Sequence, residues 1–319
     1  MHYRRLGHSG LKVSEISLGS WVTFGNQIDE TVAIALIKEA FSQGINFFDN
    51  ADMYANGLAE TVMGKAIKGL PRPELVISSK VFWPTMKGPN GRGLSRKHIT
   101  ESIHASLKRL GTDYVDLYFC HRYDPDTPVE EVVRTMTDLI HQGKILYWGT
   151  SEWEASQVMQ AYGTAREYGL IPPTMDQPQY NLFHRKRVED DLMPVCRELG
   201  IGLTTFSPLY YGILSGKYNE GIPQGSRASL DDYGWIKERI TPQRVDIVRQ
   251  LTAVANDLGI TPAQLAIAWI LRRKEVSTVI TGATRLEQLD ENLGASEAYE
   301  KLTELDIDRI FACLANYQE

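Results

Sequence analysis

The sequence lacks the patterns that mark disulfide-bonded, metal-binding and membrane-spanning proteins. Its three cysteines, Cys120, Cys196 and Cys313, are far apart and form no CxxC pair, which argues against a disulfide framework and a zinc knuckle. The seven histidines include no HExxH motif, so we expect no metal site. No apolar run approaches the ~18 residues of a membrane span, and the first ten residues lack the apolar core of a signal peptide. Together these absences predict a cytoplasmic protein that does not insert into a membrane.

The sequence also lacks long stretches in which all charges have the same sign. The formal net charge is -6, and acidic and basic residues are mixed along the chain, so there is no basic stripe to neutralise phosphates of a nucleic acid. The hydrophobic fraction of 43% is typical of a folded globular protein. A length of 319 residues allows either two ordinary domains or one large α/β barrel.

Short β-rich runs alternate with helical patterns at a spacing of roughly thirty residues, the size of a βαβ unit. Eight runs indicate strands, near residues 15, 45, 75, 115, 146, 175, 201 and 277. Helical patterns begin near residues 31, 95, 128 and 186, and each ends at a glycine. The pairs Thr241-Pro242 and Thr261-Pro262 are typical N-caps of two further helices. The count favours a single (β/α)8 TIM barrel over residues 1–319.

A doubly wound sheet is the alternative architecture. Such a sheet would usually carry a G-x-G-x-x-G motif between its first strand and helix, and the sequence has none there. Before the first barrel strand, YRRLGHSGLKV predicts a β-hairpin. Two long insertions, at 82–95 and 207–240, follow strands and would lie at the C-terminal mouth of a barrel. The second insertion is either a solvated excursion or a lid over a site.

Four ionisable residues are predicted to meet at this mouth, because polar residues at the carboxyl ends of barrel strands face a common opening. Asp49, Lys80 and His121 end three strands, and Tyr54 lies in the loop after Asp49. An ammonium beside a phenol stabilises the phenolate, so we expect Lys80 to lower the pKa of Tyr54 and make it a proton donor. Asp49 would compensate the charge of Lys80, and His121 would polarise a carbonyl.

This set of residues suits carbonyl reduction, which also needs a hydride donor. Each residue taken alone has a structural explanation as well, as a loop cap, a rim residue, an ion pair or a buried hydrogen-bonding group. Their coincidence at predicted strand ends favours the catalytic interpretation.

Longer segments show a family resemblance. The stretch FFDNADMYANGLAETVMGKAI resembles the aldo-keto reductase signature, with an aspartate, a tyrosine five residues later and a G-x-x-E-x-x-x-G helix start. Segments along the whole chain, including LGSWVTFGNQI, TSEWEASQVMQAY, SPLYYGILSGKY and ITGATRLEQLDEN, are similar in particular to the β subunits of voltage-gated potassium channels and their bacterial relatives. The resemblance implies a (β/α)8 barrel that binds NADP(H) without a doubly wound fold, and a catalytic tetrad of Asp49, Tyr54, Lys80 and His121.

The resemblance also implies positions for the cofactor and the substrate. The cofactor residues are Ser20, Trp21, Gln27 and Asp49 near the nicotinamide, Ser151, Glu152 and Gln177 at its carboxamide and ribose, Phe206 stacked on its ring, Ser207, Pro208, Leu209, Tyr211, Lys217 and Arg227 around the pyrophosphate and adenosine, and Gly282, Thr284, Gln288, Glu291 and Asn292 around the 2′-phosphate and adenine. The substrate residues are Trp21, Tyr54, Trp83, His121 and Tyr210. Glu152 differs from the arginine or asparagine that the relatives carry beside Ser151.

The segment TGATRLEQLDEN allows a physical check of the phosphate assignment. It predicts a strand end, a short turn and a helix start, whose free N–H groups and positive dipole attract a phosphate, and Arg285 adds positive charge. A simple helix cap is the alternative. Taken with the resemblance, the segment favours NADP(H) over NAD(H), since only NADP(H) brings the extra phosphate.

The main functional hypothesis is NADPH-dependent reduction of small aldehydes, ketones or α-dicarbonyls to alcohols. The position of His121 is typically asparagine in the channel subunits and histidine in the catalytic relatives, so we expect real turnover.

The second hypothesis is a redox-sensing subunit that holds NADP(H) and regulates a partner such as a channel. Because the chain begins close to the hairpin, without a segment that plugs a pore, the sequence favours channel modulation less than carbonyl reduction. A lyase or aldolase with Lys80 as a Schiff-base amine is the third hypothesis. The resemblance also implies a homotetramer or a larger homo-oligomer.

Overall fold

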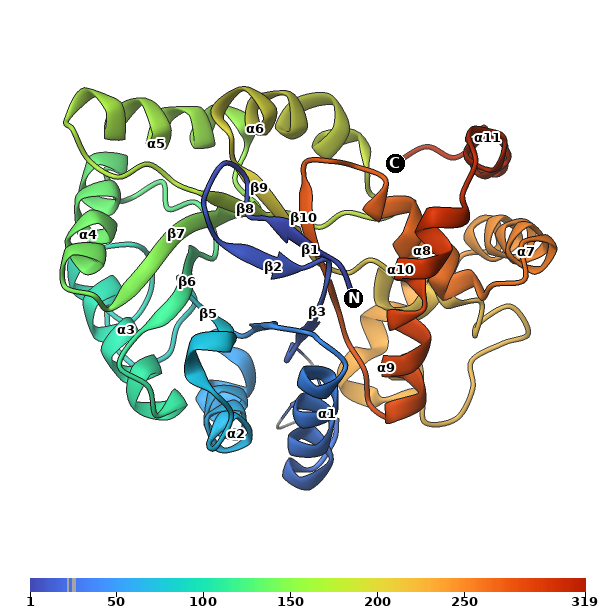
Figure 1. Ribbon diagram of the computed structural model, residues 1–319, viewed down its shortest axis with the longest axis horizontal. Helices are drawn as coiled ribbons and strands as arrows, with labels where there is room; N and C mark the ends of the chain where they lie inside the picture. The colour runs from blue at the N-terminus through green and yellow to red at the C-terminus, as the bar shows by residue number, and fades with distance from the viewer. Residues whose placement is uncertain (22, 25–26) are drawn as a thin grey trace.

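The protein is described by a computed structural model that covers residues 1–21, 23–24 and 27–319. Its centre is a closed barrel of eight parallel strands in the order β10-β3-β4-β5-β6-β7-β8-β9, which helices surround (Figure 1). The barrel strands are β3 Ile16–Gly19, β4 Phe47–Asp49, β5 Val76–Val81, β6 Val115–Cys120, β7 Ile145–Ser151, β8 Met175–Gln177, β9 Gly202–Thr205 and β10 Val276–Thr281. The prediction of a (β/α)8 barrel is confirmed, and each of the eight predicted strands is present.

The helices lie outside the barrel (Figure 1). They are α1 Glu30–Ser42, α2 Leu58–Ile67, α3 Arg96–Leu110, α4 Val129–His141, α5 Ala155–Glu167, α6 Met193–Leu199, α7 Pro242–Asp257, α8 Pro262–Leu271, α9 Leu286–Leu293, α10 Ala295–Lys301 and α11 Glu304–Cys313. Short 3₁₀ segments are η1 Tyr54–Gly57, η2 Arg72–Glu74, η4 Tyr210–Ser215, η5 Arg227–Ser229 and η6 Asp231–Arg239. Among the described helices, none alone has the length and apolar content for a membrane span; α7 and α8 pass only as a pair, which is bent by 87°.

The helix ends follow the local sequence signals. The Thr241 and Thr261 hydroxyls accept hydrogen bonds from Arg244 N and Gln264 N, which confirms both predicted N-caps. One predicted helix differs in its first turns: the segment from residue 186 begins as the π-helix η3 Arg187–Leu192 and becomes α-helical only at Met193. Pro194 follows in the sequence and has no amide N–H to donate, so the preceding turn is free to widen.

The predicted hairpin is also confirmed. Strands β1 Tyr3–Arg5 and β2 Lys12–Ser14 pair antiparallel and lie across the centre of the barrel in Figure 1. Leu6 and Val13 of the hairpin region belong to a buried apolar cluster with inward-facing barrel residues such as Phe47, Leu117 and Phe119. The hairpin therefore closes the N-terminal end of the barrel, and only the carboxyl ends of the strands are left to form an open mouth.

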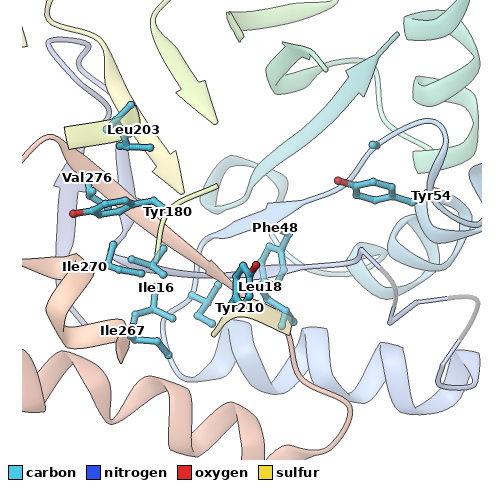
Figure 2. Packing of buried hydrophobic residues seen from close by; sticks show 14 of the residues in the cluster. Ile16, Leu18, Phe48, Tyr54, Tyr180, Leu203, Tyr210, Ile267, Ile270 and Val276 are labelled. Carbon is cyan, nitrogen blue, oxygen red and sulfur yellow. The ribbon is translucent and has the colours of Figure 1, made fainter. Parts of the chain in front are cut away.

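A larger apolar cluster lies between the strands and the helices. Figure 2 shows part of it, with Ile16 and Val276 of the barrel and Ile267 and Ile270 of α8. Neighbouring residues of one strand alternate between the two clusters, as Phe47 and Phe48 do, because successive side chains of a strand point to opposite faces. Towards the mouth, the inward positions change from apolar to ionisable residues.

We predict that Gly149→Ala destabilises the barrel. Gly149 of β7 pairs with Met175 of β8, and a Cβ atom at Gly149 would lie 2.1 Å from the Met175 carbonyl oxygen. The two strands would have to separate locally, which should lower the free energy of unfolding by about 2 kcal/mol in urea titrations. Gly163→Ala is the matched control, because a Cβ atom there meets nothing within 4 Å in helix α5. It should raise stability by about 0.5–1 kcal/mol; equal stabilities of the two variants would contradict the prediction.

Candidate active site

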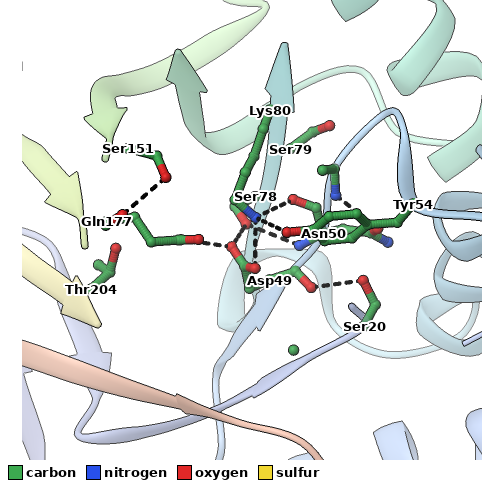
Figure 3. A network of polar contacts seen from close by, with 12 residues as sticks. Ser20, Asp49, Asn50, Tyr54, Ser78, Ser79, Lys80, Ser151, Gln177 and Thr204 are labelled. Carbon is green, nitrogen blue, oxygen red and sulfur yellow. Dashed lines mark hydrogen bonds and ion pairs between the residues drawn. The ribbon is translucent and has the colours of Figure 1, made fainter. Parts of the chain in front are cut away.

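A buried ion pair lies at the mouth of the barrel (Figure 3). The Lys80 Nζ atom donates to Asp49 Oδ2 at 2.7 Å, to the Asn50 carbonyl oxygen at 2.8 Å and to the Tyr54 hydroxyl at 3.3 Å. Lys80 is completely buried and Asp49 is 3% exposed. The sequence predicted that these residues meet, and the barrel brings them together because β4 and β5 are hydrogen-bonded neighbours.

The second carboxylate oxygen of Asp49 is also fully used. Asp49 Oδ1 accepts hydrogen bonds from the Ser78 hydroxyl at 2.7 Å and from Gln177 Nε2 at 3.0 Å (Figure 3). A buried charge is stable only when its hydrogen-bonding positions are filled, and here residues of two strands, β5 and β8, fill those of Asp49. The Gln177 side chain, expected at a carboxamide, is held by Asp49 in this structure, while the Ser151 hydroxyl donates to the Gln177 carbonyl oxygen at 2.9 Å.

Tyr54 is held above Lys80 by an unusual turn. Ala55 and Asn56, the two residues after it, have φ angles of 48° and 54°, in the left-handed region that non-glycine residues rarely adopt. Gly57 continues the turn and leads into α2, where the Glu60 carboxylate pairs with Arg109 Nε at 2.6 Å. This anchored turn fixes the direction of the Tyr54 side chain, at a conformational cost of roughly 1–3 kcal/mol per strained residue.

The electrostatics of Tyr54 differ from the sequence prediction. Burial, followed by the charge of Asp49, raises the pKa of Tyr54 well above its usual value, whereas Arg122 opposes the increase. Burial also lowers the pKa of Lys80, although Asp49 acts in the other direction. The predicted lowering of the Tyr54 pKa is therefore wrong for the free protein, because burial outweighs the opposing charge of Arg122. Tyr54 is fully protonated at neutral pH, which is the starting state that a proton donor needs.

His121 lies beside Tyr54, with ring centroids 5.8 Å apart and an interplanar angle of 75°. Burial, and then the charges of Lys80 and Arg122, lower the pKa of His121 well below its usual value. The imidazole is therefore neutral at physiological pH. Its Nδ1 atom has no hydrogen-bond partner among the described residues. A neutral imidazole carries one N–H donor, which can bind a carbonyl oxygen.

A cavity of about 880 Å³ extends from this cluster. It has the size of a small-molecule or nucleotide site. The predicted residues that line it are Trp21, Gln27, Asp49, Tyr54, Trp83, His121, Ser151, Glu152, Gln177, Phe206, Ser207, Pro208, Leu209, Tyr211, Lys217, Arg227, Gly282, Thr284, Gln288, Glu291 and Asn292. Residues far apart in the sequence thus share one surface, which only the closed barrel can produce.

Three predicted residues do not line the cavity. Lys80 lies beneath Tyr54, and Ser20 is buried, where its hydroxyl donates to the Asp49 carbonyl oxygen at 3.0 Å (Figure 3). Tyr210, predicted to contact substrate, packs against Phe183 and lies well apart from Tyr54 in Figure 2. The structure therefore corrects the prediction for Tyr210. The strained turn at 210–211 directs Tyr211, and not Tyr210, into the cavity.

The far end of the cavity carries positive charge. Lys217, Arg227 and Arg285 line it, and neither Lys217 nor Arg227 forms an ion pair with the described acidic residues. Loss of surrounding water, followed by the charges of Arg227 and Arg285, lowers the pKa of Lys217 to about 8, although its side chain keeps contact with the solvent of the cavity. Burial lowers the pKa of Arg227 as well. Unpaired cations that repel one another favour a bound anion, so this end fits the phosphates of a dinucleotide.

Glu152 has a defined structural role in the same wall. Its φ angle is 57°, and its Oε1 atom accepts hydrogen bonds from Gln179 N at 2.6 Å and from Arg187 Nη2 at 3.0 Å. Because these protein groups hold the carboxylate, Glu152 stabilises the loop after β7.

Sequence reasoning missed several residues of the cavity wall. Met53, Arg122, Gln179, Trp235 and Arg239 line it as well. The signal for Arg122 was present, since it follows His121 directly at the end of β6. Trp235 and Arg239 lie in η6, inside an insertion whose path the sequence does not specify.

A (β/α)8 barrel with a buried tyrosine, lysine and aspartate beside a long cavity, cationic at its far end, defines an enzyme class suited to hydride and proton transfer. The chain belongs to the aldo/keto reductase family, whose family model matches residues 15–315. The family comprises oxidoreductases that act on small carbonyl compounds and generally bind NAD(P)H.

Two curated relatives are similar over almost the whole chain. A protein of Arabidopsis thaliana described as "Probable voltage-gated potassium channel subunit beta" is 49% identical over 316 residues, which cover 97% of this chain and 95% of the relative. A protein of Oryza sativa subsp. japonica with the same description is 48% identical over 316 residues, with coverages of 98% and 96%. These relatives confirm the resemblance to the channel β-subunit branch.

We predict that Lys80→Met destabilises the fold strongly. The substitution leaves the Asp49 carboxylate buried without its ammonium partner, which should cost about 3–5 kcal/mol in urea unfolding. The double variant Asp49→Asn/Lys80→Met removes both charges and should regain most of that loss. Lys97→Met breaks an exposed pair with Glu101 on α3, and as the matched control it should change stability by less than about 0.5 kcal/mol. A loss at Lys80 as small as that at Lys97 would contradict the pair's structural importance.

Proposed function

We propose that the protein reduces small aldehydes, ketones and α-dicarbonyls to alcohols with NADPH as the hydride donor. The observation that carries the proposal is the position of the Tyr54 hydroxyl, 3.3 Å from Lys80 Nζ and on the wall of a cavity whose far end is cationic. A proton donor at one end and a phosphate-binding end at the other match the two ends of a nicotinamide dinucleotide and its substrate.

Each residue of the site has a separate role in the proposed reaction. NADPH, when bound, supplies a hydride to the carbonyl carbon, while the C=O π electrons move to the oxygen. Tyr54 gives its hydroxyl proton to that oxygen, so that an alcohol and NADP⁺ are formed and the phenolate later takes a proton from water. Lys80 stabilises the phenolate as it forms, and Asp49 keeps the ammonium in place. His121, neutral, donates a hydrogen bond that orients the carbonyl.

Residues of the chain would also hold the cofactor. Phe206 offers an aromatic face, and Ser151 and Gln177 lie near the proton donor. Gln288 in the first turn of α9 and Asn292 in its last turn line the other end of the cavity. The N-terminal end of that helix and the nearby Arg285 supply N–H donors and positive charge for a 2′-phosphate. We therefore propose NADPH as the preferred cofactor over NADH.

Tyr54→Phe should remove carbonyl turnover and retain cofactor binding. Loss of a positioned proton donor lowers the rate by about 10²–10⁴-fold, whereas a phenylalanine fills nearly the same space, so the Kd for NADPH should change little. Steady-state assays on several aldehydes and fluorescence titration with NADPH measure both effects. Tyr168→Phe, at an exposed position after α5, is the control and should keep full activity. Wild-type turnover by Tyr54→Phe would disprove the proton-donor assignment.

Lys217→Met should weaken NADPH binding by roughly 10- to 100-fold, since it removes a charge-assisted hydrogen bond to a phosphate. Lys274→Met is the matched control, because Lys274 is exposed and precedes β10 at the opposite end of the barrel. The wild-type Kd should also rise as the pH increases through about 8, because the free protein loses the Lys217 proton there and phosphate binding requires it. Equal affinities of the two variants for NADPH would contradict this part of the proposal.

A second candidate is a redox-sensing subunit, which the description of the two plant relatives favours. A sensor should retain NADP⁺ for long times and show little flux. Stopped-flow measurement of NADP⁺ release distinguishes the two functions, since rapid release with multiple turnovers supports the reductase. We also propose that the protein forms a homo-oligomer, which light scattering on the purified protein would test.

A further inference from the structure

Arg122 lies at the catalytic end of the cavity without a role in the reaction described above. It follows His121 at the end of β6, lines the cavity and is half-buried. Its guanidinium lies 5.7 Å from the centre of the Trp83 ring, and its Nη1 atom donates to the His121 carbonyl oxygen. These two contacts fix the guanidinium close to the residues that would act on the carbonyl.

The charge of Arg122 has no acidic partner among the described residues. Asp124 and Asp126 are its nearest acidic neighbours in sequence, and the Asp124 carboxylate already accepts from Leu94 N and from the Thr127 hydroxyl, both at 2.7 Å. No ion pair of Arg122 occurs in the described part of the chain. A guanidinium has five N–H donors, of which one is used in the contact with His121, so most of its hydrogen-bonding capacity is directed elsewhere.

The phosphate end of the cavity does not account for this charge. The cations that lower the pKa of Lys217 are Arg227 and Arg285, whereas Arg122 lowers the pKa of Tyr54 and of His121. Arg122 therefore acts on the proton-donor end of the cavity, whereas Arg227 and Arg285 act on Lys217 at the far end. Arg92 adds a second guanidinium 5.6 Å from the centre of the Trp83 ring, at an exposed position outside the cavity.

We propose that Arg122, on the Trp83 ring, forms an anion subsite that binds a carboxylate or phosphate group of the carbonyl substrate. The substrate class is then a small aldehyde or ketone that carries an anionic group within a few bonds of its carbonyl. This inference rests on the proposed reductase function and specifies its substrate. The planar guanidinium fork matches both carboxylates and phosphates, and the aromatic ring covers the apolar part between the anion and the carbonyl.

The test compares charged and uncharged aldehydes of the same shape. For the carboxylate arm, kcat/KM is measured for 4-formylbenzoate and for its methyl ester with wild type and Arg122→Gln. The ratio of kcat/KM for the charged aldehyde to kcat/KM for the uncharged aldehyde should be roughly 10- to 100-fold lower in the variant, because a charge-assisted pair is lost. The intrinsic reactivity of each aldehyde cancels when the variant is compared with the wild type. The phosphate arm uses 4-formylphenyl phosphate against 4-methoxybenzaldehyde, and the arm with the larger fall identifies the anion.

The matched control is Arg92→Gln, which removes the same charge from the same aromatic ring but outside the cavity. The ratio of kcat/KM for charged over uncharged aldehydes should change by less than about fivefold in Arg92→Gln, as expected for an exposed charge. Arg122→Lys should give an intermediate ratio, because the charge is kept and the planar fork is lost. If Arg122→Gln affects charged and uncharged aldehydes equally in both arms, Arg122 acts only on the pKa values of its neighbours and the anion subsite is wrong.

A binding measurement separates failure of this inference from failure of the reductase proposal. Benzoate binding to the protein with NADP⁺ is measured by calorimetry for wild type, Arg122→Gln and Arg92→Gln. Benzoate should bind wild type and Arg92→Gln and bind Arg122→Gln about tenfold or more weakly. If the wild type reduces no carbonyl, the reductase proposal fails while this measurement still decides the subsite; if the aldehydes are reduced and benzoate binds all three proteins equally, only the subsite is wrong.

Discussion

The candidate site depends on one buried ion pair, between Lys80 and Asp49. Two charges without water are tolerated only where every donor and acceptor is satisfied, and here the Asn50 carbonyl, the Ser78 hydroxyl and the Gln177 amide complete the set. The pair and these groups together come from β4, the loop after β4, β5 and β8, so the pair can form only when the barrel is closed. Conversely, a barrel with either charge unpaired would be destabilised strongly by a buried, uncompensated charge at its mouth. Fold and site therefore stabilise each other through the same few contacts.

Much of this arrangement is predictable from the sequence because its causes are local. Short β-rich runs define the strands, threonine-proline pairs begin two helices, and ionisable residues at the ends of three strands face the mouth, which gives Asp49, Lys80 and His121. Two features are not local. The direction of the Tyr54 pKa is the net effect of burial and several charges, and the choice between Tyr210 and Tyr211 depends on a strained turn inside a long insertion. Neither leaves a pattern in the sequence.

Backbone strain is concentrated at the same end of the molecule. Among the described residues, the non-glycine residues with positive φ are Ala55, Asn56, Glu152, Ser207, Tyr210 and Tyr211, and all of them lie in loops after β4, β7 and β9. No such residue occurs in the described loops at the hairpin end. Each costs of the order of 1–3 kcal/mol, which a barrel closed at its base and packed on two apolar clusters can offset. The positions of these residues therefore distinguish the two ends of the barrel. The hairpin end stabilises the fold, whereas the strained backbone at the mouth directs side chains into the cavity.

The anion subsite and the proton donor are coupled through charge. In the free protein, Arg122 lowers the pKa of both Tyr54 and His121. An anion bound to Arg122 would neutralise this effect, so the pKa values of the phenol and of the imidazole would both rise, and both groups would become weaker hydrogen-bond donors. An anionic substrate would thus reduce the acidity of Tyr54 while it gains an ion pair with Arg122. Because Lys80 stays charged and adjacent, the Tyr54 phenolate would still form beside a fixed ammonium. Proton transfer from Tyr54 would therefore depend on the Lys80–Asp49 pair more for a charged substrate than for a neutral one.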